Sequence, residues 1–92
     1  MTYEKVTWHH QFETEPVEMY MELDDNRYEK RKIEVFRSGV LSAVGTGIKS
    51  DISFLSIEPI PMPDEISKDS QFSHKMISPE DFELVWRKAI DA

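Results

Sequence analysis

The strongest constraint on the fold of this chain is an amphipathic pattern near its C-terminus. Apolar residues recur there at the helical spacing i, i+3, i+4, i+7 and i+8: Phe82, Val85, Trp86, Ala89 and Ile90. Ser78 precedes them as a helix N-cap, Pro79 fits the first helical position, and Asp81 completes an approximate capping box. A helix with this stripe must bury it, and the apolar face of a sheet is the only large surface that the remaining sequence offers.

The residues before this helix are typical of a series of strands. Alternating or β-prone segments span residues 3–10, 17–23, 28–37, 40–44 and 52–57. Residues 24–27 and Ser38-Gly39 supply turns, and such hairpin connections imply an antiparallel sheet. Pro63 can occupy the first turn of a short helix over residues 64–68. The sequence therefore predicts a single α+β domain over residues 1–92: an antiparallel meander of four to five strands, a short helix, and a C-terminal amphipathic helix packed on one sheet face.

The second predicted strand assigns the two faces of this sheet. Its apolar side chains share one face: Val17, Met19, Met21 and Leu23. We expect this face to form the core beneath the C-terminal helix. Glu18 and Glu22 lie on the opposite face, which we expect to be open to water. Arg31 shares its face with Ile33 and Val35, so we expect its side chain to reach past the core edge or to pair there.

The composition limits the class of protein. Hydrophobic residues make up 39% of the chain and charged residues 32%, which is too apolar for a disordered chain and too charged for a membrane protein. The N-terminus carries no apolar signal segment and the chain has no cysteine, so we expect a cytoplasmic protein. The net charge of −7 argues against nucleic acid and anionic membranes, and it favours a basic protein partner. The alternative is that the acidity only keeps the domain soluble.

An acidic run around the second predicted strand is the candidate binding surface. The predicted partner-binding residues are Glu13, Glu15, Glu18, Glu22, Asp24 and Asp25, with Tyr20 as an aromatic anchor. A basic run follows directly: Arg27, Lys30, Arg31, Lys32 and Arg37. If the second and third strands pair, these runs form cross-strand ion pairs worth about 0.2–1 kcal/mol each, so a structural role is the alternative. Exposed carboxylates on an open sheet form no pocket for acid–base catalysis, so we expect no catalytic residue.

Histidine offers the only other candidate chemistry. In a strand, His9 and His10 point to opposite faces and cannot bind one metal ion, and His74 is isolated in a polar stretch. We expect one ring of the His9-His10 pair to pack beside an aromatic residue and the other to be solvated, with no metal and no cofactor bound. The alternative is an enzyme or metal-binding domain in which His10 acts with Glu22 or another neighbouring carboxylate.

Several segments resemble a small, uncharacterised bacterial domain family. The matching segments are Trp8-His9-His10, Glu15-Pro16-Val17, Tyr20-Met21-Glu22-Leu23-Asp24, residues 27–36 and Glu58-Pro59-Ile60-Pro61. They follow the family pattern W-x-H, E-P-V, Y-x-E-L-D, R-x-E-x-R-K-x-E-x-F and E-P-I-P, whereas residues 45–54 depart from it. The family has no established activity. Its small acidic members look similar to immunity proteins of bacterial toxin systems, including contact-dependent growth inhibition, by an analogy of size, charge and fold type.

Three functions follow as expectations. The first is an immunity protein that binds a basic nuclease toxin domain and neutralises it by non-covalent occlusion, with no enzymatic activity of its own. The second is the small enzyme or metal-binding domain built on His10. The third is a regulatory module that self-associates through an exposed edge strand. We expect the chain to be a monomer or a weak homodimer.

Overall fold

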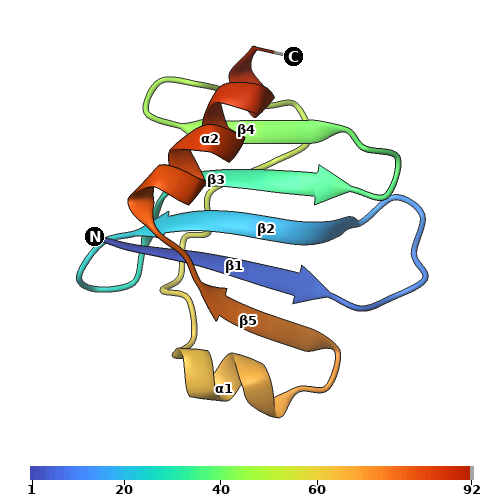
Figure 1. Cartoon of the computed structure of the whole chain (residues 1–92), viewed down its shortest axis with the longest axis vertical. Helices are drawn as coiled ribbons and strands as arrows, with labels where there is room; N and C mark the ends of the chain where they lie inside the picture. The colour runs from blue at the N-terminus through green and yellow to red at the C-terminus, as the bar shows by residue number, and fades with distance from the viewer. Residues whose placement is uncertain (92) are drawn as a thin grey trace.

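The chain folds into a five-stranded antiparallel sheet with one helix at an edge and one across a face (Figure 1). The computed structural model describes residues 1–91. The elements are β1 (Thr2–Trp8), β2 (Pro16–Leu23), β3 (Glu29–Phe36), β4 (Leu41–Gly45), α1 (Pro63–Lys68), β5 (Phe72–Met76) and α2 (Pro79–Ile90). The strand order is β4-β3-β2-β1-β5, so β4 and β5 are the two edges. The predicted α+β class is confirmed.

The first four strands form the predicted meander. The turn between β3 and β4 is the predicted Ser38-Gly39 pair, where Gly39 adopts a φ of 93° that glycine tolerates without steric cost. The fifth strand was wrongly placed at residues 52–57, which lie in the loop of residues 46–62 between β4 and α1. That segment runs across the sheet because Ser53 is buried and its hydroxyl forms a hydrogen bond with the Ser42 hydroxyl, at 2.8 Å between the oxygens. The actual fifth strand is β5, which pairs antiparallel with β1.

Helix α2 begins and is capped as its sequence predicts. The Ser78 hydroxyl oxygen accepts a hydrogen bond from the Asp81 backbone N–H at 3.1 Å, with Pro79 in the first turn. Phe82 and Trp86 are buried against Ile33 and Ala43. The predicted stripe is one residue too long, because Ala89 packs against the core whereas the Ile90 side chain at the C-terminal end is 43% exposed.

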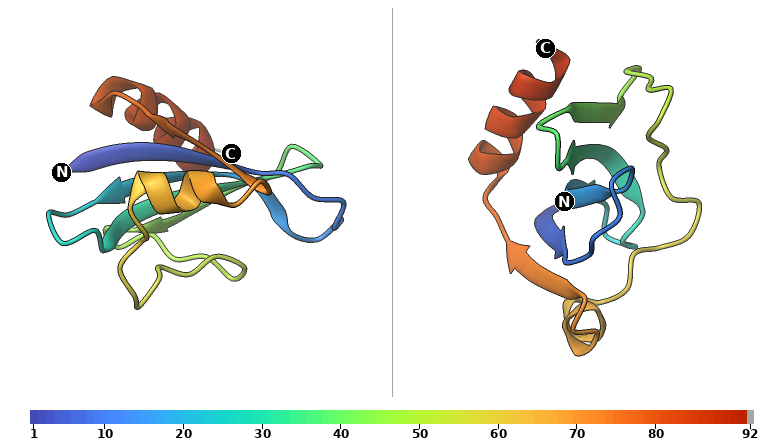
Figure 2. Two further views of the ribbon diagram at one scale, coloured as in Figure 1. Left: turned by 90° about the horizontal axis from the view of Figure 1, so that it is seen from below. Right: turned by 90° about the vertical axis from the view of Figure 1, so that its right-hand side faces the viewer.

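The prediction of the face on which α2 packs is wrong. Helix α2 covers the face that carries Tyr3, Tyr20 and Ile33, opposite the methionine-bearing face of β2 (Figure 2). Glu22 also lies on the α2 face and is buried at 8% exposure, so this face is not an open carboxylate surface. The face can receive a helix because Arg31 neutralises Glu22 and its guanidinium stacks on Phe82 and Trp86, at 4.8 and 4.9 Å from the ring centroids.

The methionine-bearing face holds a second core. Val6, Met21 and Leu23 are buried there, and Ile60 from the loop and Ile66 from α1 pack against them. Figure 2 shows this loop on the side of the sheet that α2 leaves uncovered. The sheet is therefore covered on both faces by different segments. Within residues 1–91, no helix has the length and apolar content needed to cross a bilayer.

Candidate functional site

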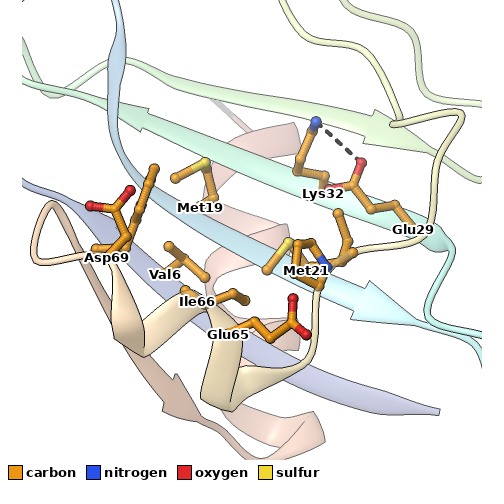
Figure 3. A pocket seen from close by; sticks show the side chains of 11 residues that line it. Val6, Met19, Met21, Glu29, Lys32, Glu65, Ile66 and Asp69 are labelled. Atoms are coloured by element: carbon orange, nitrogen blue, oxygen red, sulfur yellow. Dashed lines mark ion pairs between the residues drawn. The ribbon is translucent and has the colours of Figure 1, made fainter.

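The most distinctive concave feature lies on the methionine-bearing face, between the sheet and α1 (Figure 3). It is a cavity of about 380 Å³, which we call the methionine cleft. Its lining residues are Val6, Met19, Met21, Glu29, Lys32, Ile60, Pro61, Glu65, Ile66, Asp69 and Phe72. The alternation of β1 and β2 sends Val6, Met19 and Met21 to its floor, and α1 supplies Ile66 from the opposite side. Methionine is unbranched and polarisable, so this floor can adapt to different apolar groups.

Charged side chains surround the apolar floor. Glu65 and Asp69, at the α1 side of the cleft, are both exposed. On the sheet side the Lys32 ammonium pairs with the buried Glu29 carboxylate at 3.2 Å, and Glu29 also accepts a hydrogen bond from the Ser56 backbone N–H. The single basic residue of the cleft is thus already paired, and the cleft has an acidic rim.

Arg27 holds the loop wall of the methionine cleft in place. Its side chain donates hydrogen bonds to the carbonyl oxygens of Ile60 at 3.0 Å and Pro61 at 2.9 Å, while its own carbonyl oxygen accepts from the Ile60 N–H. Arg27 adopts a left-handed φ of 67°, which is costly for a side chain of this size and indicates that the surrounding contacts enforce it. The cleft wall is therefore fixed by contacts before any ligand arrives.

The same arginine neutralises the most deeply buried carboxylate. Glu4 is 0% exposed and accepts two hydrogen bonds from Arg27, at 2.8 and 3.0 Å, and one from His74 Nε2 at 2.7 Å. Burial alone would raise the pKa of Glu4, but the hydrogen bonds from Arg27 and His74 outweigh it and the pKa lies below its ordinary value. This triad ties β1, β5 and the turn before β3 together beside the cleft.

A second ionic cluster lies on the α2 face. Arg31 bonds to both carboxylate oxygens of Glu22 at 2.9 Å and also pairs with Glu83 of α2, and the Tyr3 hydroxyl donates to Glu22 at 2.8 Å. The hydrogen bonds from Arg31 hold the pKa of Glu22 below its ordinary value. The hydrogen bond to Glu22 raises the pKa of Tyr3. The predicted cross-strand pairing of the acidic and basic runs is confirmed here, since Glu22 and Arg31 are register partners.

The predicted partner-binding residues do not form one surface. Glu18, Tyr20 and Glu22 lie on the α2 face, where Glu18 pairs with Lys5 at 2.9 Å and Tyr20 packs against the core beneath α2. Asp24 and Asp25 lie in the β2–β3 turn at one end of the sheet. Asp24 accepts hydrogen bonds from the backbone N–H groups of Tyr28 and Asn26, and the bond from Tyr28 is the main cause of its lowered pKa.

Glu13 and Glu15 lie elsewhere, on the rim of a second cavity on the methionine-bearing face. This cavity of about 640 Å³, which we call the aromatic cavity, is lined by Trp8, Glu13, Thr14, Glu15, Pro16, Met19, Lys32, Glu34, Phe36, Ser38, Val40, Ile52 and Phe54. Met19 and Lys32 line both cavities, so the two hollows adjoin along β2 and β3. Of the predicted binding residues, only these two glutamates border a cavity on this face.

The rings of His9 and His10 are engaged by neighbouring residues of the chain. His10 donates from Nε2 to the Pro16 carbonyl oxygen at 2.8 Å and accepts from the Phe12 N–H at Nδ1, so both ring nitrogens are engaged. Its ring lies 4.2 Å from the Trp8 ring, as predicted for one histidine of the pair, whereas the exposed His9 contacts the Ser73 hydroxyl. The proposed pairing of His10 with Glu22 is wrong, because Glu22 is bonded to Arg31 and Tyr3. In residues 1–91 no group of three potential metal ligands occurs.

Sequence reasoning missed both the cleft and the buried triad. The alternation of β1 places Glu4 on the same face as Val6, so a charged residue in a core position was the available signal. Its partners come from 23 and 70 positions away along the chain, which a local pattern cannot reveal. Likewise, the cleft forms only because residues 46–62 and α1 fold back onto the sheet.

The two lowered carboxyl pKa values predict a loss of stability in acid. Because the folded pKa values of Glu4 and Glu22 lie below the ordinary 4.5, the unfolded chain binds more protons as the pH falls below that value. Their contribution is complete above about pH 5 and is lost as the pH falls through the folded pKa values, at up to about 1.4 kcal/mol per pH unit for each group. Urea unfolding of wild type and Glu22→Gln between pH 7 and 3 measures this. The free energy of unfolding of Glu22→Gln should depend less steeply on pH than that of wild type, whereas the exposed-site control Asp51→Asn should keep the wild-type dependence. Equal slopes for Glu22→Gln and wild type would contradict the lowered pKa of Glu22.

A family profile described as a domain of unknown function, DUF6881, matches residues 2–91 of the chain. The matched range includes every strand and both helices. No curated protein and no solved structure matches the chain significantly.

Proposed function

We propose that this chain, which belongs to the DUF6881 family of domains of unknown function, is a binding domain that holds a basic protein partner in the methionine cleft. The sequence-based expectation of a small uncharacterised domain family is confirmed by this membership. The partner we propose is a bacterial toxin domain, which the chain would neutralise as an immunity protein by covering its surface. The observation that carries the proposal is an apolar cleft with an acidic rim.

The apolar floor supports binding of a protein segment. Open, apolar concavities on small soluble domains are typical of interaction sites, because unused apolar surface is unfavourable in water. An apolar side chain of the partner would cover the cleft residues that are only partly buried in the free chain, at about 25 cal/mol for each Å² removed from water. These residues are Met19, Ile60, Ile66 and Phe72. Methionine-lined surfaces can repack around partners of different shape.

The charge of the rim supports a basic partner. Glu65 and Asp69 present exposed carboxylates, and the only cation of the cleft, Lys32, is held by Glu29. The chain as a whole carries a net charge of −7, which steers a basic protein toward it and repels nucleic acid. A nuclease toxin domain is basic because it must bind phosphates, so it fits this charge.

The fixed wall of the cleft supports tight binding. Arg27 bonds to both Ile60 and Pro61, and Glu29 bonds to the Ser56 N–H, so the loop is already ordered in the free chain. Because the loop does not have to become ordered when the partner binds, association costs less conformational entropy. Neutralisation of a toxin by occlusion needs such tight binding.

The proposal is tested with the protein encoded next to this chain. Its C-terminal domain is purified and titrated against the chain by isothermal titration calorimetry. We expect a one-to-one complex with a dissociation constant below about 1 μM, equivalent to about −8 kcal/mol. An acidic neighbour, or a basic neighbour that shows no heat of binding and no protection of growing cells on co-expression, contradicts the proposal.

Reversing the rim charge should weaken this complex. The double variant Glu65→Lys/Asp69→Lys is expected to raise the dissociation constant at least about tenfold, since like charges would oppose a basic partner. The matched control is Glu80→Lys/Asp91→Lys, which makes the same change in net charge on α2, across the sheet. One control substitution lies at the start of α2 and the other at its C-cap, so their effects on the helix dipole oppose each other. Equal weakening by both pairs would mean that overall charge, and not the cleft, governs binding.

A further inference from the structure

We infer that the aromatic cavity is a subsite for an arginine side chain, carried by the same partner segment that fills the methionine cleft. This inference rests on the proposed function and names the chemistry of its ligand. The two cavities adjoin, because Met19 and Lys32 line both of them. Together they form one groove along β2 and β3, bounded on one side by the loop of residues 46–62.

The dimensions of the groove fit an extended segment. Met21 borders the methionine cleft and Pro16 borders the aromatic cavity, and both lie on β2. Five residue steps along a strand cover about 16 Å, at about 3.3 Å per residue. An extended peptide of about five residues therefore places one side chain in each cavity. The groove runs with the strands, so an extended ligand can follow it without bending.

The walls of the aromatic cavity suit a planar cation. Trp8, Phe36 and Phe54 supply aromatic rings, and the Phe54 side chain is 73% exposed, an unfavourable position for a large apolar group in the free chain. A guanidinium group stacks on such rings and is more weakly hydrated than an ammonium group, so arginine is favoured over lysine.

The carboxylates of the aromatic cavity suit the positive charge of an arginine side chain. Glu13 and Glu15 are exposed on the rim, and Glu34 lines the cavity while accepting a hydrogen bond from the Ser53 hydroxyl. The only cation of the lining is Lys32, whose ammonium group is directed to Glu29. An arginine placed here can stack on a ring and bond to a carboxylate at the same time, as guanidinium groups do in their strongest pairings.

Short peptides test the subsite independently of the natural partner. The probe is acetyl-Leu-Ser-Thr-Ser-Arg-amide, prepared also in the reverse order because the direction of binding is open. The matched control carries citrulline in place of arginine, which keeps the shape and removes the charge. Binding is followed by NMR on labelled protein. The Trp8 indole N–H reports the aromatic cavity, the Met21 methyl group reports the cleft, and the Met19 methyl group reports both. Trp86, on the sheet-facing side of α2, is an internal reference.

The expected result is that one of the arginine peptides binds at least about fivefold more tightly than its citrulline form, moving Trp8 but not Trp86. The double variant Glu13→Gln/Glu15→Gln should remove that preference, and Glu80→Gln/Asp91→Asn should retain it. If the methionine methyls shift equally for arginine and citrulline peptides and Trp8 does not move, the arginine subsite is wrong and the methionine cleft stands. If no probe moves Trp8, Met19 or Met21 at millimolar concentration, both the subsite and the cleft proposal are overturned.

Discussion

Replacing Arg27 by methionine is expected to lower the free energy of unfolding by about 3–5 kcal/mol. The guanidinium group provides two of the four side-chain hydrogen bonds to Glu4, whose side chain has no exposure to water. Without it the buried carboxylate keeps only the bonds from His74 and from the Thr2 hydroxyl, and it loses its charged partner. The variant also loses the bonds to the Ile60 and Pro61 carbonyls, so the wall of the methionine cleft should loosen and partner binding should weaken with it. Urea unfolding at pH 7 measures the change in stability.

A double-mutant cycle separates the ion pair from the other contacts of Arg27. Glu4→Leu and the double variant Glu4→Leu/Arg27→Met complete the cycle, and the coupling free energy should be about 1–3 kcal/mol. The surface control is Arg87→Met on α2, which is exposed and should change stability by less than about 0.5 kcal/mol. A cost for Arg27→Met below about 1 kcal/mol, with no coupling to Glu4, contradicts the role given to the triad.

Replacing Phe82 by alanine is expected to cost about 3–5 kcal/mol. Phe82 is the largest fully buried side chain, and its ring packs 5.4 Å from that of Tyr3 and 6.2 Å from that of Trp86, measured between centroids. Its removal leaves a cavity under α2 and also takes away one of the two rings on which the Arg31 guanidinium stacks. Thermal and urea unfolding measure the loss, which arises entirely on the α2 face.

Leu84→Ala is the matched control for Phe82. It lies on the same helix but is 55% exposed, so its replacement should change the free energy of unfolding by less than about 0.5 kcal/mol. Under conditions in which Phe82→Ala stays folded, its affinity for the partner should equal that of wild type, because the groove lies on the other face. A loss of affinity in the folded variant would place part of the binding surface on the α2 side.

Local sequence patterns correctly predicted those elements that depend only on residues close together along the chain. The Ser78-Pro79 cap, the helical stripe from Phe82 to Ala89 and the alternation of β2 depend on neighbouring residues only, and each was confirmed. The apolar segment of residues 52–57 looks like a strand locally. It becomes a loop because the Ser53 and Ser56 contacts with distant strands replace the pairing of a strand.

The face of the sheet that α2 covers could not be read from the sequence. Polar residues on that face of β2 indicated that the face is open to water. However, Arg31 neutralises Glu22, and its flat guanidinium group fills the space beneath two aromatic rings. The apolar face of β2 was correctly identified as buried at Met21 and Leu23, but the residues that cover it come from the loop and α1. An alternation pattern identifies two faces and does not say which later segment packs on each.

The candidate site was only partly accessible to prediction for the same reason. The abundance of acidic residues was correctly recognised, but the acidic run along the chain was predicted to form one surface. The alternation of β2 and the turns on either side of it place these residues on three separate parts of the molecule. The rim of the methionine cleft instead uses Glu65 and Asp69, which follow the proline-rich segment. The toxin partner remains a proposal, as does the absence of catalysis.

The central claim is that the partner occupies the methionine-bearing face, and the five methionines of the chain test it directly. Methionine methyl groups labelled with carbon-13 give one signal each: Met1, Met19, Met21, Met62 and Met76. On adding the basic partner domain, the signals of Met19 and Met21 should shift or broaden, while Met1 at the exposed N-terminus should not. A complex that forms with Met19 and Met21 unmoved would contradict the claim.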